Sequence, residues 1–99
     1  MARRAARVDA NQGDIIAGLR RVGAQVQPIH VVGKGCPDIM VAFRGAWYVA
    51  ELKDGNKPPS DRKLTPDEIE WHDKFNRVAP VYVWTSIEDA LLTIGATGL

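Results

Sequence analysis

Residues 35–53 read GCPDIMVAFRGAWYVAELK, and this stretch has the pattern of a β-hairpin. Positions 38–43 and 46–52 are rich in β-branched and aromatic residues, which are the types that strands favour. The Arg44-Gly45 pair between them suits a tight two-residue turn. The stretch therefore predicts two antiparallel strands with a fixed pairing.

The predicted pairing brings charged residues together at the open end of the hairpin. Counting outward from the turn places Asp38 opposite Glu51, and Cβ atoms of directly opposed residues lie about 4.5–5.5 Å apart. Lys53 follows Glu51 by two residues and therefore lies on the same face. Two hard oxygen ligands beside an ammonium group suit Mg²⁺ or Mn²⁺. The alternative is a surface cluster in which Lys53 simply neutralises two acids.

The order and spacing of these residues resemble a known nuclease pattern. Pro37-Asp38, twelve intervening residues and then Glu51-Leu52-Lys53 resemble the PD-(D/E)XK motif. The flanking sequences are similar to the VRR-NUC branch of that group in its short, stand-alone form. These flanks are Gly33 to Asp38, Lys53-Asp54-Gly55 and Leu64-Thr65-Pro66. The resemblance implies an α/β fold with a restriction-endonuclease-like core, in the order α-β-β-β-α-β-α, whose central mixed sheet is flanked by helices.

The resemblance also implies an activity, which is metal-dependent and structure-selective cleavage of DNA phosphodiester bonds. Asp38 and Glu51 would hold Mg²⁺ (or Mn²⁺), with the main-chain carbonyl of Leu52 as a third oxygen. Lys53 would orient the attacking water or stabilise the transition state. The short forms resemble Holliday-junction resolvases, and two symmetric cuts in a four-way junction predict a homodimer.

One position departs from the family pattern. In relatives the N-terminal helix often adds a glutamate to the metal shell, whereas the matching region here is Asn11-Gln12. The helical wheel makes Gln12 the better candidate for a site residue and Asn11 the second. An amide can contact a metal or its water but cannot act as a base. This departure therefore argues against a two-metal mechanism more than against activity itself.

Two rival classes of protein remain open. One is a nuclease of the same fold that cuts flaps or duplex DNA in repair or restriction. The other is a non-catalytic DNA-binding module. The complete set of Asp38, Glu51 and Lys53 argues against the module, because a protein that only binds DNA has no need of all three.

Apolar periodicity predicts the elements before the hairpin. The first predicted helix runs from about Ala10 to Val22, and Gly23 follows as a stop. Its apolar stripe consists of Ile15, Ile16, Leu19 and Val22. Residues 24–32 are predicted as the first strand.

The second half of the chain carries clear helix signals. Thr65 is predicted to cap a helix as part of a capping box with Glu68, with Pro66 at the first helical position. The position of Glu68 on the apolar stripe fits a capping role and equally a polar role behind the site, and capping is the favoured one. The stripe of this helix is predicted to face the core, so that its aromatic residues are core side chains and not base-stacking platforms. It consists of Leu64, Glu68, Trp71, Phe75 and Val78. A short strand from residue 81 to 84 and a helix from 87 to 94, capped by Ser86, complete the pattern.

Composition limits the remaining possibilities. The 99 residues carry a net charge of +1 with 25% charged residues, which predicts one globular domain over 9–99 after a basic flexible arm at 1–8. The single cysteine, Cys36, excludes an internal disulfide and favours a cytoplasmic location. No segment is long and apolar enough for a membrane span. The cations predicted to contact the DNA backbone are Lys34, Lys57, Arg62 and Lys63.

Overall fold

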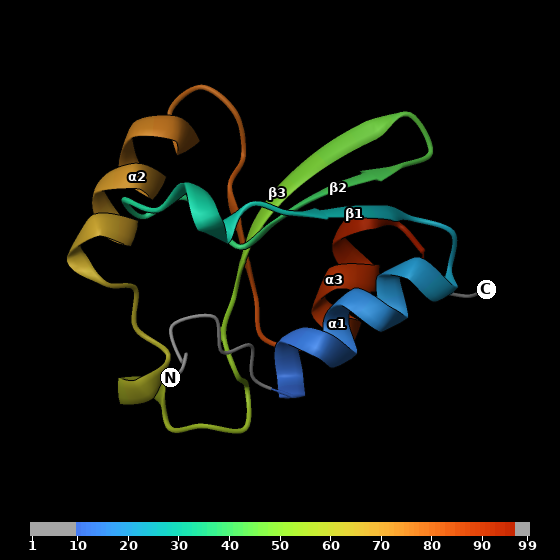
Figure 1. The fold of residues 1–99 in the computed structure, drawn as a ribbon, viewed down its shortest axis with the longest axis horizontal. Helices are drawn as coiled ribbons and strands as arrows, with labels where there is room; N and C mark the ends of the chain where they lie inside the picture. Colours follow the sequence, from blue (N-terminus) through green and yellow to red (C-terminus); the bar gives the residue numbers. More distant parts are fainter. Residues whose placement is uncertain (1–9, 97–99) are drawn as a thin grey trace.

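Three α-helices surround a four-stranded sheet in the computed structural model, which describes residues 10–96 (Figure 1). The helices are α1 (Ala10–Arg21), α2 (Pro66–Asn76) and α3 (Ile87–Ile94), and the strands are β1 (Gln25–Pro28), β2 (Ile39–Phe43), β3 (Ala46–Leu52) and β4 (Tyr82–Trp84). Two short 3₁₀ helices, η1 (His30–Val32) and η2 (Pro59–Asp61), lie between them. This order confirms the predicted α-β-β-β-α-β-α pattern. The basic arm predicted at 1–8 lies outside the described residues. No helix in the described range is long and apolar enough to cross a membrane.

The sheet is mixed, as predicted. Its strand order is β1-β2-β3-β4, with antiparallel pairing along the first three strands and a parallel pairing of β3 with β4. The hairpin pairs Phe43 with Ala46 and Met40 with Val49, which confirms the register counted from the Arg44-Gly45 turn. The regular ladder ends at the pair of Ile39 and Ala50, so Asp38 and Glu51 lie one position beyond it.

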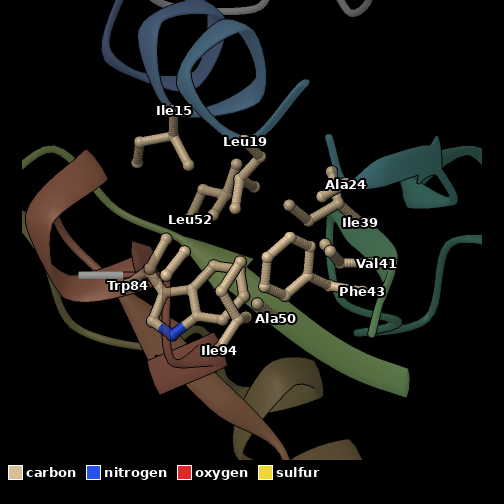
Figure 2. Close-up of a cluster of buried hydrophobic side chains, with 12 residues drawn as sticks. Ile15, Leu19, Ala24, Ile39, Val41, Phe43, Ala50, Leu52, Trp84 and Ile94 are labelled. Atoms are coloured by element: carbon tan, nitrogen blue, oxygen red, sulfur yellow. The ribbon is translucent and has the colours of Figure 1, made fainter. Parts of the chain in front are cut away.

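Helices α1 and α3 lie together against one face of the sheet, and the hydrophobic core fills the space between them (Figures 1 and 2). Alternate residues of β2 and β3 point into this core because side chains of a strand alternate between its two faces. Ile15 and Leu19 of α1 are fully buried, and Ile16 and Val22 pack at the margin, which confirms the predicted stripe. Trp84 of β4 is also buried, and its indole N–H donates to Thr93 Oγ1 at 3.0 Å.

The helix caps form as the sequence predicts. Thr65 Oγ1 accepts from Glu68 N at 3.2 Å, and Glu68 Oε1 accepts from Thr65 N at 2.9 Å, which completes the capping box of α2. Ser86 Oγ accepts from Asp89 N at 3.1 Å at the start of α3. Gly95 ends α3 in the left-handed conformation, with φ of 79°. Both helices are therefore bounded by local sequence.

The first strand is shorter than the predicted 24–32. It ends at Pro28, because the backbone leaves the extended conformation at Ile29, where ψ is 6°. The chain then turns into η1, where Val31 and Val32 are 83% and 69% exposed. The prediction that the first strand continues to residue 32 is therefore wrong.

The predicted core role of the α2 stripe is also wrong. Helix α2 has no buried residue and stands apart from α1 and α3 (Figure 1). Val78 is 89% exposed and Phe75 is 42% exposed, while Trp71 is half-buried. Periodicity identifies an apolar stripe, but it does not say what the stripe faces, and here much of it lies on the surface.

Candidate active site

Asp38 is held by main-chain contacts at the open end of the hairpin. Its N–H donates to Ala50 O at 3.1 Å, and its carbonyl accepts from Ile29 N at 2.8 Å. Its carboxylate Oδ2 accepts from Leu52 N at 2.8 Å. Since these contacts join the end of β1 to β3, the Asp38 carboxylate is fixed beside the last residues of β3.

Glu51 is the buried acid of the site. It lies in β3 between the core residues Ala50 and Leu52, so its side chain points to the sheet face opposite α1 and α3. The residue is 4% exposed, and its Oε1 has no hydrogen-bond partner among residues 10–96. Burial raises the pKa of Glu51 to about 9, and the negative charges of Asp38 and Glu68 add to this effect. At neutral pH the free protein therefore holds this carboxyl in its protonated form.

Lys53 joins the acids of the site. Its Nζ lies 2.9 Å from Glu68 Oε1 and 3.7 Å from Glu51 Oε2. Burial alone would lower the pKa of Lys53, but the hydrogen bond to Glu68 and the charges of Glu68, Glu51 and Asp38 outweigh it and raise the pKa. Lys53 is therefore an ammonium ion at neutral pH, which fits a role in charge stabilisation and not in proton abstraction.

Glu68 fills both roles that the sequence left open, of which only capping was favoured. The same Oε1 that closes the capping box also accepts from Lys53 Nζ. Burial acts to raise the pKa of Glu68, but the hydrogen bonds from Thr65 N–H and from Lys53 outweigh it, so the pKa is lowered. The sequence signal for this contact is the position of Glu68 on the apolar stripe of α2. In the fold, Glu68 is the residue of that stripe that contacts Lys53. Glu68 thus links the start of α2 to the site.

Helix α1 reaches the site through Asn11. Its Nδ2 donates to Lys53 O at 2.9 Å and to Thr85 O at 3.4 Å, so one amide holds the ends of β3 and β4 together. Gln12, the preferred candidate from the helical wheel, is half-buried on the same helix, and its role at the site stays a prediction. The second candidate, Asn11, contacts the end of β3 through its hydrogen bond to Lys53 O.

The other predicted residues occupy the surroundings of the site. Lys34, Lys57 and Lys63 are exposed, whereas Arg62 is half-buried with its Nε out of contact with solvent. Cys36 is half-buried, and burial together with the charges of Glu51 and Asp38 raises the pKa of its thiol. The thiol is therefore protonated at neutral pH, which opposes a nucleophilic role for Cys36.

Replacing Glu51 by Gln is expected to stabilise the metal-free protein by roughly 1–3 kcal/mol at pH 7. Glu51 has a pKa of about 9 when folded, against an ordinary value of 4.5. Because the folded value is the higher one, the stabilising contribution of this carboxyl is complete below pH 4.5 and is lost as the pH rises toward 9. Glutamine does not titrate, so the stability of Glu51→Gln lacks this pH dependence. The difference in free energy of unfolding between Glu51→Gln and the wild type should therefore grow from pH 4.5 to 9.

Urea unfolding of both proteins in EDTA, at several pH values within the window, measures this difference. Glu70→Gln, which replaces an exposed glutamate of α2, is the control and should leave the pH dependence unchanged. Parallel curves for the wild type and Glu51→Gln would show that the buried carboxyl does not hold a proton in the folded protein.

Comparison with known proteins relates this fold to a solved structure. No protein-family model and no curated protein matches the sequence. A solved structure described as a VRR_NUC domain superimposes with a TM-score of 0.60 at 28% sequence identity, covering 83% of this chain and 89% of that one. This chain has the mixed sheet flanked by helices, with two acids and a lysine gathered at the end of its hairpin. In its fold the chain is therefore similar to a VRR_NUC domain, and this likeness supports membership of the VRR-NUC family.

Proposed function

We propose that this protein is a metal-dependent DNA endonuclease whose site is of the PD-(D/E)XK type. The observation that carries the proposal is Glu51, a buried acid with an unpartnered carboxylate oxygen, placed beside Asp38 and within 3.7 Å of Lys53. An arrangement that served stability alone would not bury a second acid next to the first, because that acid must either take up a proton or carry a charge that repels Asp38, and both cost free energy. A cation bound between the acids would remove this cost, because it would replace the proton and neutralise both carboxylates.

The residues present fit a hard divalent cation. Asp38 and Glu51 supply carboxylate oxygens, and the carbonyl of Leu52 is the proposed third ligand, since the amide of that residue already bonds Asp38. Within residues 10–96 no group of three or more His, Cys, Asp or Glu side chains forms a metal site. Water and substrate oxygens would therefore complete the shell, as they commonly do around Mg²⁺. The bound ion would supply neutralisation of phosphate charge and acidification of a water molecule.

The chain's own groups then act on the scissile phosphate. Lys53 presents an ammonium next to the two acids, where it can stabilise negative charge that develops in the transition state. Glu68 holds Lys53 in that position, and Asn11 holds the main chain of the same residue. Since the lysine is fixed before substrate arrives, no reorganisation is needed at the moment of reaction.

Exposed cations near the site fit contact with a DNA backbone. Lys57 and Lys63 lie in the polar loop that follows β3, and Gly55 N donates to Thr85 O at 3.1 Å, which fastens this loop beside the end of β4. Arg62 and Lys34 are the other proposed contacts. Cations on a loop that leaves the site would fix the position of the duplex without reading its sequence.

The proposed substrate is branched DNA, and the proposed assembly is a homodimer. Support comes from the resemblance of the short VRR-NUC form to junction resolvases and from symmetry, because two matched cuts in a four-way junction need two related sites. Flap and duplex cleavage are the competing outcomes, and DNA binding without cleavage is the third.

Cleavage is expected to require Mg²⁺ or Mn²⁺ and to fail with Ca²⁺ or EDTA, because catalysis needs the tighter coordination of the smaller ions. The measurement is incubation of purified protein with labelled four-way junction, flap and duplex DNA of matched sequence under each condition. Cleavage that EDTA does not reduce would exclude the metal assignment. Binding without cleavage under every condition would favour a DNA-binding module.

A further inference from the structure

An aromatic pair lies on the exposed side of α2 next to the candidate site. The rings of Trp71 and Phe75 stack with centroids 3.8 Å apart and an interplanar angle of 20°. Phe75 is 42% exposed, and α2 contains no buried residue, so this pair is not part of the core. Two stacked rings at a surface offer an aromatic face to a ligand.

The same two rings line a pocket of about 450 Å³ whose other walls are charged. Lys34 and Lys74 contribute two ammonium groups, and Asp67 and Glu70 contribute two carboxylates. None of the ion pairs within the described part of the chain involves either lysine. Lys74 Nζ instead lies 5.8 Å from the centre of the Phe75 ring. An aromatic wall with both donors and acceptors at its rim matches a nucleobase, whereas two carboxylates would disfavour a phosphate alone.

The pocket adjoins the candidate active site. Trp71 follows Glu68 by three residues, so the two side chains occupy adjacent turns of α2 with Cβ atoms about 5–6 Å apart. Glu68 in turn contacts Lys53 at 2.9 Å. A ligand in the pocket would therefore lie about one helical turn from the cluster that contains Asp38 and Glu51.

The turn that carries Lys34 lies directly against the start of α2. Gly35 has φ of +83°, and a Cβ at this position would collide with the carbonyl of Asp67, so only glycine allows the two backbones to meet. Lys34 itself has φ of +55°, a conformation that glycine would adopt at lower cost. The backbone thus holds a lysine in a strained position at the pocket wall, which is a common feature of ligand sites.

We propose that this pocket binds an unpaired nucleobase of the DNA next to the cleavage position, with the base stacked on the Trp71–Phe75 pair. The inference rests on the proposed nuclease function and narrows its substrate to branched DNA that carries an unpaired base, such as a flap, because the bases of intact duplex and of a fully matched four-way junction are all paired. Lys34 and Lys74 would meet the adjoining phosphates, and the carboxylates of Asp67 and Glu70 would accept hydrogen bonds from base amino groups.

The test compares the affinity of the protein for two labelled DNAs that differ by a single unpaired base, in Ca²⁺ so that neither is cut. Stacking predicts roughly tenfold tighter binding of the DNA with the unpaired base. Phe75→Leu keeps the apolar bulk but removes the π face, and it should abolish this preference. Phe75→Tyr keeps the ring and should retain it. Trp47→Leu is the matched control, since Trp47 is 69% exposed near the hairpin turn, at the far end of β3 from Glu51.

The outcomes separate this inference from the nuclease proposal. Loss of the preference in Phe75→Leu, with retention in Phe75→Tyr and Trp47→Leu, supports the base pocket. An equal preference in Phe75→Leu, or no preference in a wild-type protein that binds and cuts DNA, overturns the pocket and leaves the nuclease intact. A change of oligomeric state in Trp71→Ala, with the preference unchanged, would make the pair a subunit contact. Failure to bind either DNA would overturn both proposals.

Discussion

Asp38→Asn and Glu51→Gln are each expected to reduce DNA cleavage on the order of a thousandfold or more, because each removes one of the two charged ligands proposed for the metal. The fold should survive both changes. In Asp38→Asn the new amide oxygen can still accept from Leu52 N, and Glu51→Gln removes a buried acid whose ionisation the fold disfavours. Loss of activity would therefore coincide with unchanged or increased stability, a combination that general misfolding cannot produce.

Single-turnover cleavage of the preferred DNA measures the loss, and urea unfolding measures stability on the same preparations. Asp73→Asn is the matched control, because Asp73 is an exposed acid of α2 that pairs with Arg77 at 2.7 Å, outside the site. It should cut at the wild-type rate. Near wild-type cleavage by either site variant would show that the metal site has been misplaced.

The hairpin shows how far local sequence determines this site. The Arg44-Gly45 turn fixes the register, and the register alone places Asp38 opposite Glu51 with Lys53 on the same face. The capping signal at Thr65 is equally local and gives the start of α2. These features could be predicted because each depends on residues close together in the sequence.

The features that were missed depend on contacts between distant segments. The helical wheel of α2 gives an apolar stripe, but only the placement of the helix beside β3 shows that Glu68 meets Lys53 and that Trp71 remains near the surface. Asn11 reaches Lys53 O because α1 packs beside the end of β3, a relation that helical periodicity cannot supply. Local patterns therefore predicted the two acids and the lysine, while tertiary packing determined what holds that lysine in place.

Lys53→Ala is expected to lower cleavage by roughly a hundredfold to a thousandfold while metal and DNA binding remain. Its ammonium contacts Glu68 and Glu51 and is not a proposed metal ligand, so the contact that is lost acts in the transition state. Lys53→Arg should rescue poorly, since a planar fork replaces a compact charge. The kinetic signature is a fall in the single-turnover rate with an unchanged Kd for DNA.

Glu68→Gln tests whether the ion pair with Glu68 positions Lys53, because the variant keeps the charge of the lysine and removes its charged partner. Glutamine still serves at this place in a capping box, so α2 keeps its start, but the charged partner of Lys53 is lost. Cleavage should fall to a value between wild type and Lys53→Ala. If Glu68→Gln cleaves as fast as wild type while Lys53→Ala is inactive, the ion pair does not position the lysine.

A mixture of wild-type and Lys53→Ala chains tests the proposed dimer. If two subunits each cut one strand of a four-way junction and exchange freely, an excess of the inactive chain places most wild-type subunits in mixed dimers. Those dimers should nick one strand and leave the junction unresolved, so nicked product should accumulate while linear duplex falls faster than the wild-type fraction. The control is the same excess of an inactive protein that does not exchange subunits, confirmed by sedimentation. Paired cuts in proportion to the wild-type enzyme alone, under conditions of proven exchange, would exclude a symmetric resolvase and favour a monomer that cuts flaps or nicks single strands.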